Sequence, residues 1–293
     1  MKLKIILPFL MLLPILTVKA QTGTTGQSLL WKISGNGLKK DSYFLLTASN
    51  VCADIGTLDK KTAAALADVQ SINVESGINN PDNQPVIKKL IQVKDANQSV
   101  KKVLSNGLYS QLATEADNVG MNEVTLNNFK PIYICGLIIK VVNPCEIPNA
   151  KTTEALVRNY AHEKNIKVGE LLTQEENFIT LDAYPNNYWE KTIDFLINDS
   201  ADAVNDLDNK TEFYKHENLR GVMAIMNKSP LLKLRYAYPD IENKRTSLLS
   251  SRIENVIKNQ SSVILIDIAN IANPNTSVFN QLTKAGYNIS AVN

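Results

Sequence analysis

Residues 263–271 read VILIDIANI, and this stretch decides the fold. Its apolar run is rich in β-branched side chains and has the length of one strand, so it predicts a strand over 262–268 that is buried on both faces of a sheet. The strand leads into Asp267 and Asn270. A second stretch of this kind, SYFLLTASN at residues 42–50, lies near the other end of the chain. We call these two stretches the strand-to-loop junctions.

Strands and helices alternate outward from the junctions. The first two strands are expected to be joined through Asn36-Gly37, a strong hairpin signal. Hydrophobic periodicity predicts the other elements. The expected strands cover 29–33, 43–47, 71–75, 167–172, 262–268 and 287–292, and the expected helices cover 58–67, 86–93, 100–104, 109–119, 131–142, 150–164, 188–207, 219–226, 231–236, 243–258 and 276–285. This alternation predicts an α/β (α+β) fold with a mixed central β-sheet covered by helices.

The N-terminus has the pattern of a bacterial secretory signal. Lys2 and Lys4 precede an apolar run over residues 5–16, and the pattern ends at Ala20. The run is shorter than the roughly 20 apolar residues of a membrane span, and no later segment is long and apolar enough to span a bilayer. We therefore expect a cleaved signal peptide over 1–20, a single domain over 21–293 without a Pro/Gly/Ser-rich linker, and an exported protein, either periplasmic or extracellular.

The charge balance argues against a nucleic-acid partner. Removal of residues 1–20 changes the formal net charge from +2 to −1. Phosphate backbones require clustered Lys and Arg, whereas the densest basic points here are isolated pairs such as Lys60-Lys61 and Lys101-Lys102. These pairs are interpreted as solvated surface charge.

The junctions and their flanks resemble the TraB/GumN family, which includes the Tiki-type metalloproteases. The flanking matches are LWKISGNG at residues 30–37 and GYNI at residues 286–289. Members of that family carry a Gly-x-x-His motif at the end of each of two strands, and the two histidines help to hold a divalent metal. The corresponding tetrapeptides here are LTAS and DIAN, which place Ser49 and Asn270 at the histidine positions. The resemblance implies the family fold in a divergent member that lacks both motif histidines.

The resemblance also implies which other residues belong to the site. Glu75 matches a glutamate at the end of the strand after the first helix, and Arg245 matches an arginine in the helix before the second motif. With Ser49, Asp267 and Asn270 they form the expected vestigial site, in which no residue is assigned a catalytic role. A carboxylate and a guanidinium that face one pocket can persist as a structural ion pair after catalysis is lost.

The ligand types argue against a metal cofactor. A zinc site needs three or four N, S or O ligands, and the neutral side chains of Ser49 and Asn270 are poor zinc ligands. The alternative is that Glu75, Asp267 and Asn270 hold a hard cation such as calcium. Tight binding of a first-row transition metal is not expected without imidazole or thiolate.

Motifs for other chemistries are missing from the sequence. It has no G-x-S-x-G elbow of a serine hydrolase, and no Walker loop or G-x-G-x-x-G fingerprint. The two histidines lie away from the junctions, His162 on an expected amphipathic helix and His216 in a polar stretch, and both are expected on the surface.

The three cysteines, Cys52, Cys135 and Cys145, fit an exported protein. Spacing alone leaves the pairing open, since Cys135 could pair with Cys145. The family resemblance implies a disulfide between Cys52 and Cys145, which would leave Cys135 as a buried free thiol.

These observations favour an exported, non-catalytic TraB/GumN-like protein whose degenerate cleft binds an unknown extracytoplasmic ligand or protein, or serves as a scaffold. The alternative is an extracytoplasmic hydrolase or peptidase with a rebuilt site around Glu75, Asp267 and Arg245. A third possibility is a purely structural secreted domain.

Overall fold

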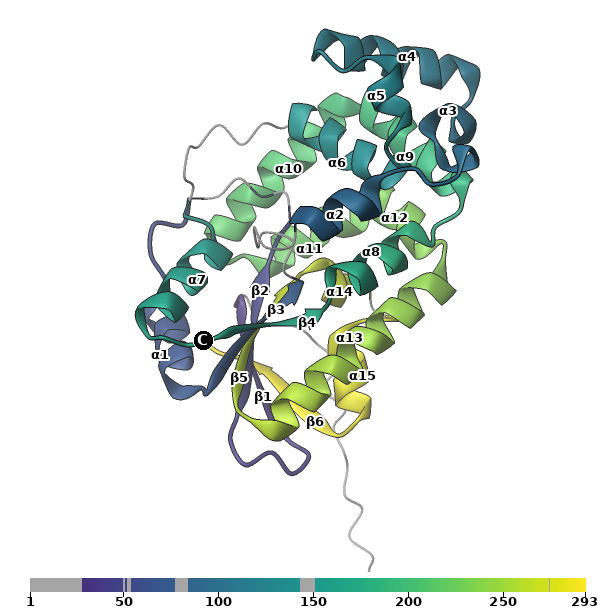
Figure 1. The fold of residues 1–293 in the computed structure, drawn as a ribbon. Coiled ribbons are helices and arrows are strands. Elements are labelled where there is room, and N and C mark those ends of the chain that lie inside the picture. The colour runs from purple at the N-terminus through teal and green to yellow at the C-terminus, as the bar shows by residue number, and fades with distance from the viewer. Residues whose placement is uncertain (1–27, 50, 52–53, 77–83, 143–150, 274) are drawn as a thin grey trace, which may run out of the picture.

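A computed structural model describes residues 28–49, 51, 54–76, 84–142, 151–273 and 275–293. One six-stranded sheet lies at one end of the molecule, with helices against both of its faces and a group of helices beyond its edge (Figure 1). The predicted α/β (α+β) class with a mixed, helix-covered sheet is therefore confirmed. The strands are β1 (Leu30–Gly35), β2 (Ser42–Thr47), β3 (Ser71–Ser76), β4 (Val168–Leu172), β5 (Ser262–Asp267) and β6 (Tyr287–Ala291).

Several of the helices begin at residues whose side chains accept hydrogen bonds from free backbone N–H groups. Asp59 caps α1 by accepting a hydrogen bond from the Thr62 backbone N–H at 2.8 Å, and Thr152 caps α7 in the same way. The helices are α1 (Lys60–Asp68), α2 (Gln84–Ile91), the 3₁₀ turn η2 (Ala96–Gln98), α3 (Val100–Val103), α4 (Asn106–Asn118), α5 (Glu123–Asn127), α6 (Pro131–Val142), α7 (Thr153–Glu163), α8 (Gln174–Asp182), α9 (Asn186–Asn198), α10 (Ser200–Lys215), α11 (Leu219–Lys228), α12 (Pro230–Tyr236), α13 (Pro239–Asn259), α14 (Ala269–Ala272) and α15 (Val278–Lys284).

The strand order is β4-β3-β5-β2-β1-β6. The first four strands of this order are parallel, and β1 runs antiparallel to both β2 and β6. Thr47 at the end of β2 pairs with Asp267 at the end of β5. The carboxyl ends of β3, β5 and β2 therefore meet at one edge of the sheet, where open α/β sheets bind ligands.

The central strand β5 is buried on both faces, as its sequence predicts. Ile264 and Ile266 lie in one core with apolar residues of α13 and α15, while Val263 and Leu265 lie in a second core with residues of α1 and α7. The alternation follows the two-residue period of a strand. The strand stays buried through Ile266, and the first polar side chain at its carboxyl end is that of Asp267.

A third core lies among the helices away from the sheet. It is built from α3, α4, α5, α6 and α9, which includes Trp189, together with Tyr184 from the turn before α9. These helices form the upper part of the molecule in Figure 1. Their apolar side chains pack mainly on one another, so this helical group has a core distinct from the two that cover the sheet.

Two expectations about helices need correction. The single helix expected over 188–207 is wrong, because the chain turns at Asp199 (φ −117°, ψ 30°) and forms α9 and α10. Helix α8 was not expected, although its start has a recognisable signal: the Thr173 hydroxyl accepts from the Glu176 N–H, and the Glu176 carboxylate accepts from the Thr173 N–H.

Other sequence expectations fall partly outside the described residues. The signal peptide over 1–20 lies outside them, as do Cys52 and Cys145 with their expected disulfide. Cys135 is a buried free thiol, as expected. His162 and His216 are exposed. Among the helices that the structure describes, none has the length and apolar character needed to cross a bilayer.

Candidate functional site

The two strand-to-loop junctions meet at the carboxyl edge of the sheet. The Ile268 N–H donates to the Thr47 carbonyl at 2.8 Å, which extends the β2–β5 pairing past the last strand residue. The Ser49 backbone N–H then donates to Oδ2 of Asp267 at 2.5 Å. Oδ1 of the same carboxylate accepts from the Ala269 N–H at 2.7 Å, where α14 begins. Asp267 thus links the loop after β2 to the turn after β5.

Glu75, Arg245 and Asn270 form a closed side-chain network beside this link. Arg245 Nη2 donates to Glu75 Oε1, and Arg245 Nη1 donates to Asn270 Oδ1. Asn270 Nδ2 donates to Glu75 Oε2 at 2.7 Å. The Arg245 and Glu75 side chains are only 7% and 17% exposed. Both members of this Arg245–Glu75 ion pair also hydrogen-bond to Asn270. Additional hydrogen bonds of this kind offset the cost of burying two charges.

The structure therefore brings together all five residues expected at the vestigial site. Ser49 contributes its backbone N–H to it. Glu75 comes from β3, Arg245 from α13, Asp267 from the end of β5 and Asn270 from α14. Their convergence follows from the parallel order β3-β5-β2, because the ends of neighbouring parallel strands lie at the same edge.

The donor set at this edge does not fit a transition metal. All four carboxylate oxygens of Glu75 and Asp267 already accept hydrogen bonds from protein N–H groups. Asn270 uses its amide oxygen for Arg245 and its amide nitrogen for Glu75. Across the described residues, His, Cys, Asp and Glu side chains form no group of three or more that could hold a metal ion. Tight zinc binding needs imidazole or thiolate ligands, which this edge does not offer.

Helix α10 adds Lys210 and Tyr214, which the sequence reasoning missed. Lys210 is half-buried, and its Nζ donates to the Ser49 carbonyl at 2.8 Å. Burial lowers the pKa of the Lys210 ammonium, while the nearby charges of Asp267 and Asp206 act in the opposite direction. The site therefore contains a cation next to Asp267 as well as the Arg245 guanidinium.

Tyr214 lies beside the end of β2. Its hydroxyl hydrogen-bonds the Leu46 carbonyl at 3.1 Å and the Thr153 hydroxyl at 2.8 Å. Burial raises the pKa of the Tyr214 hydroxyl, and the charges of Asp267 and Glu217 raise it further. Lys210 and Tyr214 are four residues apart on one helix. That spacing marks one helical face but does not distinguish these two residues from the other polar residues of α10.

Several buried polar atoms near this edge have no hydrogen-bond partner among the described residues. Nε of Arg245 is one of them. Gln174 Nε2 and Asn177 Oδ1 of α8 are two more, and the Asn177 amide nitrogen is 3.4 Å from the hydroxyl of Ser76, the residue after Glu75. Buried polar atoms of this kind ordinarily find a partner in ordered water or a ligand.

These features define an α/β protein with a polar site where three parallel strands end. The model of the TraB/PrgY/gumN family matches residues 29–291, and the chain belongs to that family. The match spans both junctions, Glu75 and Arg245, so the resemblance inferred from the sequence motifs is confirmed. The search of curated proteins gave no match, and neither did the search of solved structures.

Proposed function

We propose that this chain is an exported, non-catalytic member of the TraB/PrgY/gumN family whose polar site at the strand ends binds a small polar ligand. The observation that carries this proposal is the occupation of all four carboxylate oxygens of Glu75 and Asp267 by protein donors. Each of these protein donors competes with a metal ion or a substrate proton for the lone pairs of the oxygen, which disfavours a metal-binding or general-base role.

Asn270 supports the same conclusion. In the family pattern a histidine stands at this position, and an imidazole would be available to a metal. The Asn270 amide instead connects Arg245 to Glu75 through one acceptor and one donor. The substitution thus turns a ligand position into a link within a buried polar network.

A ligand is favoured over a purely structural role by the buried atoms that have no hydrogen-bond partner within the described ranges. Arg245 Nε and Gln174 Nε2 are donors, and Asn177 Oδ1 is an acceptor. Native mass spectrometry should detect an added mass on the purified chain. The added mass should be absent from Gln174→Met, which removes one donor without cutting the ion pair. Unmodified mass for both proteins would favour the scaffold interpretation.

The second candidate is an extracytoplasmic hydrolase with a site rebuilt around Glu75, Asp267 and Arg245. Lys210 is the observation in its favour, because a lysine with a lowered pKa next to a carboxylate can act in acid-base chemistry. The pairing of Glu75 with Arg245 argues against it, since the carboxylate is already engaged.

Metal and activity measurements separate the two candidates. The mature chain is dialysed against zinc, cobalt or calcium, its metal content is measured by mass spectrometry, and peptide cleavage is assayed with and without a chelator. We expect far less than one equivalent of metal and no chelator-sensitive cleavage. A full equivalent of zinc or cobalt that is lost in Glu75→Ala or Asp267→Ala, together with chelator-sensitive cleavage, would favour the hydrolase instead.

Restoration of the family motifs provides a complementary test. The variant Leu46→Gly/Ser49→His/Asp267→Gly/Asn270→His re-creates both Gly-x-x-His motifs, and it should gain zinc binding in titration calorimetry. The matched control carries the same two glycines with alanine at positions 49 and 270. Equal zinc affinity in the two variants would contradict the idea that both junctions descend from one metal site.

The proposed export is tested separately. Residues 1–20 should be absent from the mature protein isolated from the periplasm or medium of a bacterial host, and N-terminal mass spectrometry should find Gln21 as the first residue. A cell-associated protein that retains Met1 would contradict export by a cleaved signal.

A further inference from the structure

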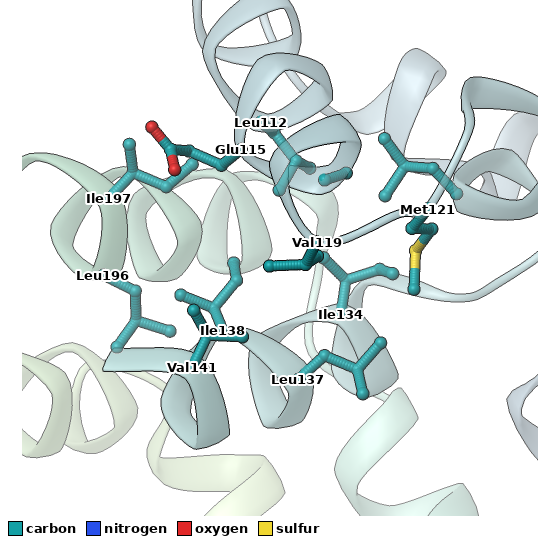
Figure 2. A pocket seen from close by; sticks show the side chains of 12 residues that line it. Leu112, Glu115, Val119, Met121, Ile134, Leu137, Ile138, Val141, Leu196 and Ile197 are labelled. Atoms are coloured by element: carbon teal, nitrogen blue, oxygen red, sulfur yellow. The ribbon is translucent and has the colours of Figure 1, made fainter. Parts of the chain in front are cut away.

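The helical group beyond the sheet contains an apolar pocket of about 240 Å³. It lies between α4, α6 and α9, and its lining also includes residues around α5 (Figure 2). None of the five vestigial-site residues lines it. Because the pocket belongs to the helical core rather than to the sheet edge, its function is independent of the proposed function of the strand-end site.

The floor of the pocket is made of fully buried aliphatic side chains. Leu112 of α4, Leu126 of α5, Ile134 of α6 and Leu196 of α9 are each at most 3% exposed. Water molecules against these side chains find few polar partners. The interior therefore favours hydrocarbon over water.

The rim of the pocket is apolar as well, except at one point. Val119 and Val141 are both 57% exposed, although they line the pocket. Glu115 is exposed and is the one charged residue among the twelve that line it. In Figure 2 its carboxylate lies beside Ile197, at the end of the pocket opposite Met121.

We propose that this pocket binds an aliphatic chain of roughly ten carbons that ends in a cationic or uncharged polar head. A Leu/Ile/Phe-lined cavity of roughly 150 Å³ holds the six carbons of benzene, and the larger volume here scales to about ten. The exposed valines extend the apolar surface to solvent, so one end of the aliphatic ligand can leave the pocket and carry a hydrated head group.

Glu115 sets the preferred charge of that head. Its carboxylate would repel a fatty-acid carboxylate at the mouth and attract an ammonium group. The carboxylate is exposed and screened by salt, so the preference is a matter of a few-fold in affinity at low ionic strength. The hydrocarbon supplies most of the affinity.

A chain-length series tests the proposal directly. Alkyltrimethylammonium ions with six to fourteen carbons are titrated below their micelle concentrations and followed by calorimetry. Affinity should rise roughly fourfold with each added methylene up to about ten carbons and then level off, because further carbons remain in water. An absence of saturable binding, or a rise that continues through fourteen carbons, would overturn the proposal.

Two variants with one control locate the binding. Ala116→Leu places a larger side chain into the pocket wall and should weaken the ten-carbon ion at least tenfold. Thr114→Leu adds a similar side chain on the exposed face of the same helix and should leave the affinity unchanged. Equal affinity in these two proteins would place the ligand elsewhere. If Ala116→Leu does not fold, as judged by circular dichroism, Ile138→Phe serves the same purpose.

The charge preference is tested with Glu115→Gln. This variant should bind the ammonium ion a few-fold more weakly than the original chain at low salt and bind decanol with unchanged affinity. A decanoate that binds more tightly than the ammonium ion in the original chain would contradict the assigned head-group class.

Discussion

The side-chain amide of Asn270 donates to Oε2 of Glu75 at 2.7 Å, although 195 residues separate the two along the chain. The same amide accepts a hydrogen bond from Arg245. A residue that stands at a metal-ligand position of the family pattern therefore completes a network of protein groups. The predictions below test how much the fold depends on that network and on its neighbours.

Removal of the Asn270 amide should destabilise the protein by about 2–4 kcal/mol. Asn270→Ala leaves Arg245 Nη1 without its acceptor. It also leaves Glu75 Oε2 with only the Asp267 backbone N–H at 3.4 Å, and an unsatisfied or poorly satisfied buried group costs about 1–3 kcal/mol. Urea unfolding measures the change. The control is Asn209→Ala, which removes one exposed hydrogen bond and should stay within about 0.5 kcal/mol. Equal midpoints for the two variants would contradict a structural role for Asn270.

Two arginines of α13 should differ sharply in their contribution to stability. Arg245→Ala leaves the Glu75 carboxylate without its ion-pair partner and should cost about 3 kcal/mol or more. Arg252, which pairs with Glu176 and is 48% exposed, should cost at most about 1 kcal/mol on the same substitution. Thermal unfolding of both variants makes the comparison. Similar losses would mean that burial of the Glu75 pair adds nothing.

Lys210 should give the protein a defined pH dependence. Since burial lowers its pKa in the folded state, the unfolded chain holds this proton more tightly, and stability rises with pH until the unfolded lysine also titrates near pH 10.4. The stability of Lys210→Met relative to the original chain should therefore be higher at pH 7 than at pH 10. The control Lys210→Arg stays charged throughout, so its difference from Lys210→Met should not change between these two pH values. If the stability of the original chain and that of Lys210→Arg change with pH in the same way, the lowered pKa of Lys210 is ruled out.

Thiol labelling should count the cysteines in two stages. Burial raises the pKa of the Cys135 thiol to about 12, so Cys135 should resist maleimide in the native protein at neutral pH. If Cys52 and Cys145 form the expected disulfide, denaturation without reductant should expose one reactive thiol, and reduction should raise the number to three. Three labels before reduction, read by mass spectrometry, would exclude the disulfide.

The order of apolar and polar residues predicted the strands well, because that order reflects which faces of each strand are buried. The run over 263–266 is apolar throughout because helices cover both faces of β5. The break between α9 and α10 was missed because the apolar stripe continues past Asp199, and nothing in that stripe marks a change of direction. Short helices such as α14 carry too few residues for any period to be visible.

The candidate site was predictable where motifs mark it and not elsewhere. Glu75, Arg245 and Asn270 could be assigned to the site from the family resemblance, and the strand order brings them together. Lys210 and Tyr214 reach the site only because α10 packs near the ends of β2 and β5, which is a tertiary arrangement. Sequence alone does not show which face of α10 is turned toward the sheet.

The position of β5 has a consequence for how the chain matures. Before residues 262–267 are available, β1 can pair only with β2, and β3 only with β4. β5 is the strand that joins these two halves, and it is made last but one. Contacts so distant in sequence form slowly. The complete sheet can therefore form only after about nine-tenths of the polypeptide has been synthesised.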